Sequence, residues 1–259
     1  MPVLTVITVV CNAREAFRNT LKSLDKQTVR DYEYIVIDGK SKDGTLEELS
    51  NFPDLIAKVI SESDRGIYDA MNKGIALAKG KYLYFLNAGD CFFEPSTLEK
   101  VIRELKSSEE TIVHGAIEVQ FEGQNRFKPA FSPTDLWQAS NFCHQGIFVR
   151  SDYHKLNPYD LSFTITADYK MVYDAYKAGM TFKMLPLTIA HFMAGGISDK
   201  NRTKLLREKL KVVSKYEPWK HFFYYHTKIA DSIFRQVMKA VLPVSVVKKI
   251  ILLKFDKKQ

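Results

Sequence analysis

The stretch LTVITVV, residues 4–10, gives the clearest indication of the fold. It is an uncharged run rich in β-branched residues, which is typical of a buried strand. Similar apolar runs follow it, and amphipathic helical segments separate them. The expected strands are 4–10, 34–37, 57–61 and 82–86, and the expected helices are 15–26, 44–50, 66–78 and 96–106. This alternation predicts an α/β fold with a Rossmann-like, mostly parallel central sheet flanked by helices.

The order of the expected elements changes after about residue 110. Strands are expected at 111–120, 146–149 and 182–192, a hairpin turn at 122–125, and helices at 136–142 and 167–178. After Ser198 the pattern is wholly helical, with Pro218 and Pro243 as interruptions. We therefore expect a first domain of residues 1–198 and a C-terminal helical extension of residues 199–259.

The positive charge of the chain belongs to this extension. The chain has 38 Lys and Arg against 30 Asp and Glu, a net charge of +8. Residues 199–259 hold 16 of these basic and 5 of these acidic residues, a net +11, which leaves −3 for residues 1–198. A mildly acidic body argues against nucleic acid as the partner of the whole protein. The three scattered cysteines form no CxxC pair, which indicates neither a zinc site nor a disulfide framework and fits a reducing cytosol.

Polar residues gather where the expected parallel strands end. Asn12 follows the first strand and Asp38 the second, and polar runs at 61–64 and 87–90 follow the third and fourth. Ligands of such sheets bind beyond the carboxyl ends of the strands. Each cluster by itself also fits a helix cap or a turn. Four of them on one rim favour a binding site.

Several segments of the chain resemble the family-2 glycosyltransferases with a GT-A fold. The likeness is greatest to bacterial enzymes that build O-antigen, capsule and colanic-acid polysaccharides, and it covers residues 3–198. It rests on TVITVVCN (5–12), IVIDGKSKDGT (35–45), SESDRGIYDAMNKGI (61–75), YFLNAGD (84–90), CHQGIFVR (143–150), TADYKM (166–171) and FMAGGIS (192–198). The resemblance implies transfer of a sugar from a nucleotide-sugar donor, expected to be a UDP-sugar.

The resemblance also implies a donor site at the strand ends. Asp38 matches the position that contacts the base or the ribose, and a turn aspartate is the alternative. Arg65 is either a phosphate contact or a solvated arginine, whereas Asp69 and Asn72 can face one side of a helix because they are three residues apart. The expected donor-binding residues are Thr8, Asn12, Asp38, Arg65, Asp69, Asn72, Asn87, Ala88, Gly89 and Asp90.

The segment NAGD, residues 87–90, stands where the family has its metal-binding DxD motif. Asp90 is the only acidic residue in this segment, because Ala88 stands where the motif has its first aspartate. Hard divalent cations bind oxygen ligands and neutralise charge on a leaving diphosphate. We expect Mn²⁺ or Mg²⁺ with Asp90 as its main protein ligand. His191 is either a second ligand or a histidine near a strand end.

Asp168 aligns with the general base of the family. The implied reaction is a single displacement with inversion, in which a carboxylate takes the proton of the attacking hydroxyl. The alternative is a carboxylate favoured by the dipole at a helix N-terminus. His144 and Gln145 are expected to line the same cleft, and the glycines 195 and 196 form either a loop near the diphosphate or a tight turn.

The extension combines basic residues with aromatic ones. A basic helix is expected at 204–216, aromatic residues crowd 219–225, an apolar stripe covers 233–242, and lysines flank an apolar segment at 244–253. This pattern favours binding to an anionic membrane surface. A helical cap or a homo-oligomer contact is the alternative. The resemblance points to a peripheral enzyme on the cytoplasmic, inner face of the cell membrane that extends a glycan on undecaprenyl diphosphate.

Two other classes of protein fit parts of the sequence. A nucleotidyltransferase on a similar sheet needs a glycine-rich basic loop after the first strand, and residues 12–14, Asn-Ala-Arg, contain no glycine. A non-enzymatic adaptor that binds membranes or nucleic acids would suit the extension but leaves the rim acids unexplained. A processive membrane synthase is disfavoured, because neither a QxxRW motif nor several apolar spans are present.

Overall fold

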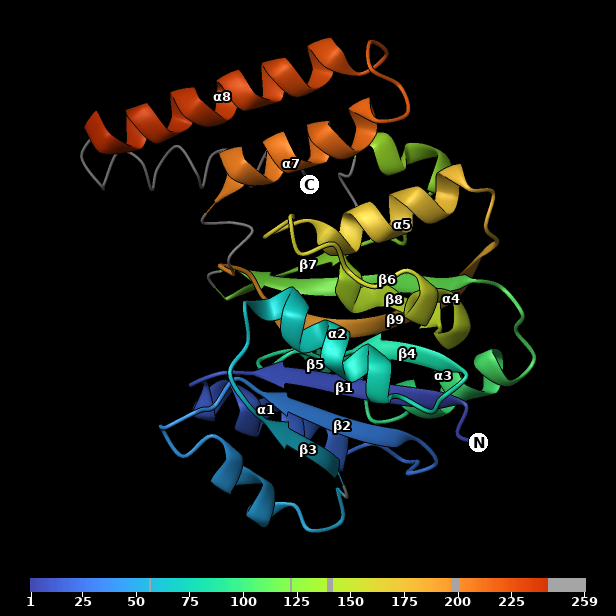
Figure 1. Ribbon diagram of the computed structural model, residues 1–259. Coiled ribbons are helices and arrows are strands. Elements are labelled where there is room, and N and C mark those ends of the chain that lie inside the picture. Colours follow the sequence, from blue (N-terminus) through green and yellow to red (C-terminus); the bar gives the residue numbers. More distant parts are fainter. Residues whose placement is uncertain (56, 122, 139–141, 197–200, 242–259) are drawn as a thin grey trace. The chain divides into compact units, whose positions relative to one another are not determined.

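The computed structural model describes residues 1–55, 57–121, 123–138, 142–196 and 201–241 (Figure 1). The chain divides into two compact units, residues 1–196 and residues 197–259. The first unit contains a central sheet, and the described part of the second is helical. The apolar segment expected at 244–253 lies outside the described residues.

A nine-stranded sheet has the spatial order β3-β2-β1-β4-β8-β6-β9-β5, with β7 paired to β6 (Figure 1). The first four strands of that order are parallel, β8 is antiparallel to both of its neighbours, and β9 is parallel to β6. The expected α/β fold is confirmed. The strands are β1 (Leu4–Val10), β2 (Glu33–Asp38), β3 (Ala57–Ser61), β4 (Tyr82–Phe85), β5 (Cys91–Phe92), β6 (Ile112–Phe121), β7 (Gln124–Lys128), β8 (Ile147–Arg150) and β9 (Phe182–Met193).

Helices cover both faces of β1, because alternate residues of a strand point to opposite sides. Leu4, Val6 and Val10 pack in one buried cluster with apolar residues of α1 and α3. On the other face, a Cβ added to Gly74 of α2 would lie 2.7 Å from Cγ2 of Ile7. The helices of the first unit are α1 (Arg14–Asp25), α2 (Ile67–Leu77), α3 (Thr97–Lys106), α4 (Ser151–Leu156) and α5 (Ala167–Lys177), with 3-10 helices at Leu46–Asn51, Pro133–Gln138 and His144–Gly146.

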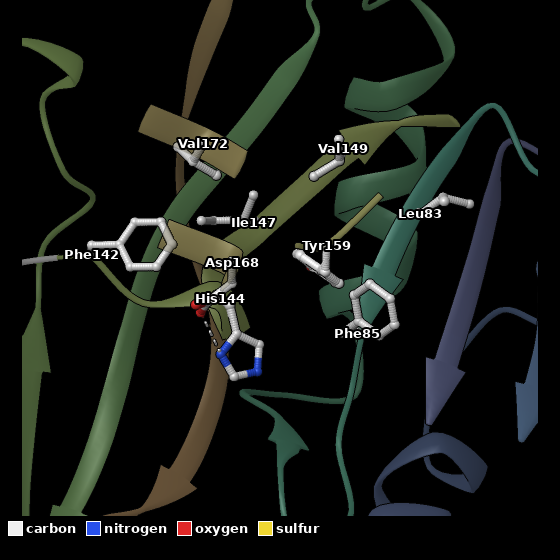
Figure 2. Close-up of a pocket in the computed structure, with 9 residues that line it drawn as sticks. All are labelled: Leu83, Phe85, Phe142, His144, Ile147, Val149, Tyr159, Asp168 and Val172. Carbon is white, nitrogen blue, oxygen red and sulfur yellow. Dashed lines mark ion pairs between the residues drawn. The ribbon is translucent and has the colours of Figure 1, made fainter. Parts of the chain in front are cut away.

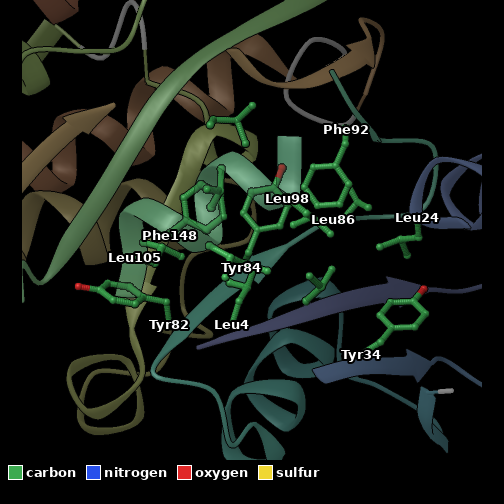
Figure 3. Packing of buried hydrophobic residues seen from close by; sticks show 14 of the residues in the cluster. Leu4, Leu24, Tyr34, Tyr82, Tyr84, Leu86, Phe92, Leu98, Leu105 and Phe148 are labelled. Carbon is green, nitrogen blue, oxygen red and sulfur yellow. The ribbon is translucent and has the colours of Figure 1, made fainter. Parts of the chain in front are cut away.

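Stacked aromatic rings hold β4 in a buried hydrophobic cluster (Figure 3). The Tyr84 ring stacks on those of Phe148 and Phe92, with centroid distances of 4.6 and 5.4 Å. The Tyr84 hydroxyl donates a hydrogen bond to the carbonyl oxygen of Gln145 at 2.7 Å, so this buried phenol is paired. The core thereby fixes the point at which β4 ends and the following loop begins.

Two of the expected helices form only short 3-10 helices. The segment expected at 44–50 is helical over Leu46–Asn51, and the segment expected at 136–142 is helical over Pro133–Gln138, with 139–141 outside the described residues. The first stays short because Pro53 follows closely and disfavours helical backbone in the residue before it.

The second unit contains the helices α7 (Arg202–Ser214) and α8 (Phe222–Val241), which pack against each other. One side of α8 is buried, and Ser232 on this side contacts the Thr203 hydroxyl at 2.8 Å. The outer side carries large apolar residues, which we call the exposed apolar face. This face comprises Phe223, Phe234, Val237 and Val241, of which Phe223 and Phe234 are 80% and 63% exposed. No helix in the described part of the chain is long and apolar enough to cross a membrane.

Candidate active site

The carboxyl ends of the first four strands meet at one edge of the sheet. Val10 of β1 pairs with Asp38 of β2, and Asp38 pairs with Ser61 of β3. Because β4 runs parallel to β1, the loop at 87–90 begins at the same edge. The topology therefore brings the polar residues that follow these strands together on one rim.

Asp38 is buried at the end of β2 and organises the loop that follows. Its carboxylate accepts hydrogen bonds from the Ser61 hydroxyl at 2.6 Å and from the backbone N–H and the hydroxyl of Ser41. Asn12 has a φ of 46°, and its side-chain oxygen accepts a 2.9 Å bond from the Lys42 N–H. These contacts join the ends of β1 and β2. The predicted contacts of Asp38 and Asn12 with a nucleotide remain predictions.

Thr8 lies inside the protein and not on the rim. Its side chain is completely buried. The hydroxyl donates a hydrogen bond to the Leu86 carbonyl oxygen at 2.7 Å and accepts one from the Tyr34 hydroxyl at 3.1 Å. Thr8 therefore supports the strand ends and, in this structure, presents no surface to a donor.

The polar residues of α2 fix the backbone around them. The Asp69 carboxylate accepts bonds of 3.0 Å from the N–H and the guanidinium of Arg65, and these bonds lower the pKa of Asp69. The Arg65 side chain itself is 79% exposed. Both polar atoms of the Asn72 amide bind the backbone of Tyr159, at 2.9 and 2.8 Å. Asp69 and Asn72 thus shape the rim, and Arg65 keeps an exposed cation on it.

The NAGD segment forms a tight turn after β4. The Asp90 N–H donates to the Asn87 carbonyl oxygen at 2.9 Å, and Gly89 has a φ of 100°, which residues with a Cβ rarely adopt. The Thr20 hydroxyl accepts a bond from the Gly89 N–H and donates one to the Asp90 carbonyl oxygen, both at 2.9 Å. Ala88 packs against the hydrophobic core. A glycine and a buried threonine therefore set the shape of this turn.

Asp90 is the buried acid of the turn. Its Oδ2 atom has no hydrogen-bond partner among the described residues, and neither has the side-chain oxygen of Asn87. Burial raises the pKa of Asp90 to about 7, although hydrogen bonds with the Gln145 side chain and the Asn87 backbone act in the opposite direction. The two unpaired oxygen atoms, Oδ2 of Asp90 and the side-chain oxygen of Asn87, are suitable ligands for Mg²⁺ or Mn²⁺. These ions take oxygen ligands from one or two carboxylates and complete their coordination shell with phosphate and water.

His191 reaches the neighbourhood of Asp90 from β9. The β5–β9 register places His191 opposite Cys91, the residue after Asp90. Its Nδ1 lies 2.9 Å from a carboxylate oxygen of Glu118, an arrangement that leaves Nε2 as the nitrogen free to bind a metal. Among the described residues, no three His, Cys, Asp or Glu side chains form a group suited to a metal ion. A cation here would therefore depend on oxygen atoms of the donor.

Asp168 lies in the first turn of α5 and faces His144 (Figure 2). The Tyr68 hydroxyl lies 2.9 Å from Oδ1 of Asp168 and 2.8 Å from the Ile165 carbonyl oxygen, so two acceptors share its single proton. Oδ2 of Asp168 lies 3.5 Å from Nδ1 of His144. Nε2 of His144 in turn lies 2.9 Å from the amide nitrogen of Asn87. Burial and the charge of Asp168 raise the pKa of Tyr68 well above its usual value, so its phenol stays protonated. A continuous chain of contacts thus joins the NAGD turn to Asp168.

An apolar pocket surrounds the pair of His144 and Asp168 (Figure 2). Burial in these surroundings lowers the pKa of His144, although the nearby Asp168 carboxylate acts to raise it. The imidazole is therefore neutral at neutral pH. The other residues that line the pocket are Leu83, Phe85, Phe142, Ile147, Val149, Tyr159 and Val172.

The remaining expected cleft residues occupy two different places. Gln145 is buried next to the Asp90 carboxyl group and is held by the Cys143 thiol, whose sulfur lies 2.7 Å from Oε1. Gly195 follows β9 with a φ of 109°, and a Cβ added to it or to Gly196 would meet no atom within 4 Å. Gln145 therefore joins the site directly, and the two glycines end the first unit.

Sequence reasoning gave no role to three residues that the structure places in the site: Tyr68, Glu118 and Thr20. Tyr68 lies within the specific segment 61–75, which was the signal available for it. Glu118 lies within a long strand and Thr20 within a helix, and neither position carries a recognisable motif.

Two solved structures illustrate proteins with a similar fold. S. aureus TarS 1–349 in complex with UDP-GlcNAc matches 89% of this chain and 71% of its own, with a TM-score of 0.65 and 15% identity. The mannosyltransferase PcManGT from Pyrobaculum calidifontis, in complex with GDP-Man and Mn²⁺, matches 100% of this chain and 81% of its own, with a TM-score of 0.63 and 14% identity. The chain therefore has the GT-A fold.

The model of glycosyl transferase family 2 matches residues 5–166, and the chain belongs to that family. A PGL/p-HBAD biosynthesis glycosyltransferase of Mycobacterium bovis is 34% identical over 65% of this chain and 67% of its own. Glycosyltransferase AglE of Haloferax volcanii is 26% identical over 82% and 72%. The predicted family and GT-A fold with C-terminal helices are confirmed. The closer likeness to O-antigen and capsule enzymes stays a prediction.

Proposed function

We propose that this glycosyltransferase moves a sugar from a UDP-sugar to a hydroxyl of a glycan acceptor, with inversion at the anomeric carbon. The observation that carries this proposal is the chain of contacts from the NAGD turn through His144 to Asp168. It connects an acid suited to the donor diphosphate, Asp90, with a carboxylate suited to a general base. The family match favours a transferase over the nucleotidyltransferase and the non-enzymatic adaptor.

Asp168 is the residue we propose to take the proton. The acceptor oxygen attacks the anomeric carbon, the bond from that carbon to the diphosphate oxygen breaks, and the acceptor proton passes to Asp168. The Tyr68 hydroxyl holds Oδ1 of Asp168 in place for this step. A bound Mn²⁺ or Mg²⁺ supplies positive charge that stabilises the leaving nucleotide. Asp90, Asn87 and His191 are the residues that would hold it.

Donor binding is expected to raise the melting temperature of the protein. A ligand that binds only the folded state stabilises it by about 2.7 kcal/mol at one hundred times its Kd. In a thermal-shift screen of nucleotide sugars with Mn²⁺, we expect UDP-sugars to give the largest shift and EDTA to remove both the shift and the activity. A larger shift with GDP-sugars would contradict the UDP assignment, and activity unaffected by EDTA would contradict the metal.

We also propose a lipid-linked acceptor, an undecaprenyl diphosphate glycan of bacterial surface polysaccharide synthesis, met at the cytoplasmic face of the membrane. The second unit supports this proposal. The helix α8 that carries the exposed apolar face also carries the exposed cations Lys228 and Arg235, of which Arg235 is paired with Asp231 at 2.7 Å. Apolar side chains beside basic ones suit an interface with anionic lipids. The enzyme would then be peripheral on the inner face of the membrane.

The double substitution Phe223→Glu with Phe234→Glu is expected to abolish binding to phosphatidylglycerol vesicles, because it places two negative charges on the exposed apolar face. Flotation of the full chain with vesicles measures this binding. Phe127→Glu is the matched control, since Phe127 is a 60% exposed phenylalanine in β7 of the first unit. If the double variant still floats, or if it only splits a homo-oligomer in light scattering, the face does not bind membrane.

A further inference from the structure

The contact between Asn87 and His144 affects how the side chain of Asp168, the proposed base, is held. Asn87 belongs to the turn on the donor side, and His144 stands between it and Asp168. We propose that Asn87 fixes the tautomer of His144 and that His144 is thereby a positioning residue, which holds the Asp168 carboxylate oriented for the acceptor hydroxyl. This inference rests on the proposed function of Asp168 as general base.

The side-chain atoms that face His144 determine which ring nitrogen of a neutral imidazole carries the proton. A carboxylate only accepts hydrogen bonds, so Nδ1, which faces Oδ2 of Asp168 at 3.5 Å, carries the proton. A neutral imidazole has one N–H, which leaves Nε2 as an acceptor. The Asn87 amide nitrogen, 2.9 Å away, supplies the N–H that Nε2 accepts. The opposite orientation of the Asn87 amide would require a proton on Nε2, and Nδ1 could then face the carboxylate favourably only in a doubly protonated, cationic imidazole.

This tautomer excludes His144 as the acceptor of the proton that Asp168 takes from the substrate. In the triad of serine hydrolases the histidine takes a proton from the nucleophile. Here Nδ1 already carries a proton, so Asp168 cannot pass its own proton to that atom. The proton from the acceptor hydroxyl remains on Asp168 until water removes it. His144 therefore acts by stabilising and orienting the carboxylate, together with Tyr68 on the other oxygen.

Asn87 also connects this pair to the donor side. Its amide nitrogen is used by His144, whereas its side-chain oxygen is buried without a partner among the described residues. The Asn87 carbonyl oxygen accepts the N–H of Asp90 and so closes the turn. Asn87 thus belongs, through its backbone, to the turn that would meet the diphosphate and, through its side chain, to the support of the base.

The tautomer can be read directly by NMR of protein labelled with ¹⁵N-histidine. His144→Gln identifies the signals of His144 by their loss. We expect a protonated Nδ1 and an unprotonated Nε2 in the native protein. Asn87→Asp, whose carboxylate can only accept, is expected to move the proton to Nε2 or to protonate both nitrogens. A native Nε2–H tautomer, or signals unchanged in Asn87→Asp, would overturn the inference.

Two substitutions of His144 separate its polar contacts with Asn87 and Asp168 from its packing. His144→Gln can still donate to Asp168 and accept from Asn87, whereas His144→Phe fills the space and can do neither. We expect kcat to fall about 100-fold in His144→Phe and about tenfold or less in His144→Gln. The affinity for UDP with Mn²⁺ is expected to stay within about twofold in both, because the losses belong to the base and not to donor binding.

The control is His226→Gln, an exposed histidine in α8 of the second unit, which is expected to leave kcat unchanged. Equal losses in His144→Gln and His144→Phe would indicate packing alone, and no loss in either would refute positioning. Asp168→Asn distinguishes a failure of the proposed base from a failure of the proposed role of His144. If it retains turnover, the proposed base is wrong. If it is inactive while both His144 variants are fully active, only the inference about His144 fails.

Discussion

Asp168→Asn is expected to lower the rate of sugar transfer by about 10²- to 10⁴-fold, the range that general bases contribute. The amide has the size of the carboxyl group and can still accept the hydrogen bond of the Tyr68 hydroxyl. It cannot take the proton of an acceptor hydroxyl. Because Asp168 contacts neither Asp90 nor the end of β2 in the described contacts, the Kd for UDP is expected to stay within about twofold. Turnover assays and titration calorimetry with UDP measure the two quantities.

Asp174→Asn is the matched control for this prediction. Asp174 lies on the same helix, where its carboxylate accepts a 2.7 Å bond from Lys170. We expect its substitution to leave turnover unchanged. Full turnover in Asp168→Asn would remove Asp168 from the mechanism. Loss of UDP binding and of stability together with turnover would instead indicate a structural carboxylate at the N-terminus of α5.

Asp90→Asn is expected to abolish activity and to stabilise the metal-free protein at pH 8. The pKa of Asp90 is about 7 in the folded state, against 3.8 for an unperturbed aspartate. Below about pH 4 the acid is protonated in both states, and its ionisation costs nothing. Between pH 4 and 7 the unfolded chain releases the proton first, so the folded state loses stability as the pH rises. The loss amounts to about 1.4 kcal/mol per pH unit and is complete above pH 7.

Urea denaturation in EDTA at pH 5 and pH 8 measures the effect. The gain from Asp90→Asn is expected to be larger at pH 8, since asparagine has no charge to bury. Glu48→Gln is the control of opposite sign. Glu48 is also buried, but hydrogen bonds from Arg18 and Arg14 lower its pKa to about 2, so its substitution removes paired charge and destabilises the fold. A stability gain that does not depend on pH would contradict a raised pKa of Asp90 in the folded protein.

The fold was predictable where a local pattern repeats along the chain. The apolar run 4–10 and its successors indicated parallel strands, and the helices between them follow from amphipathic spacing. The short strand β5 and the exposed strand β7 had no such signal, because two residues give no period and β7 has no buried face. The helix expected at 44–50 formed as a 3-10 helix at Leu46–Asn51, so the sequence predicted its end within one residue but not its type.

The sequence named the residues of the candidate site, but it gave no indication of the contacts between them. Motifs placed Asp90, His144 and Asp168 in one site, because each follows or begins an expected element. The bonds between them join residues far apart in the chain: Asn87 and His144 are 57 residues apart, and Tyr68 and Asp168 are 100 apart. No local pattern encodes such pairs, because they depend on the order of strands in the sheet. The burial of Thr8 and the use of the Asn72 amide by Tyr159 are of the same kind.

The sequence by itself determined the family, the α/β fold and the concentration of positive charge in residues 199–259. These properties are local or additive, so they can be read without coordinates. Only the tertiary structure decided which polar atoms already have a hydrogen-bond partner within the protein and which do not. Thr8 is engaged within the core, whereas Oδ2 of Asp90 is buried and unpaired among the described residues. Whether a side chain is engaged depends on which distant segments pack around it, and that packing exists only in the folded chain.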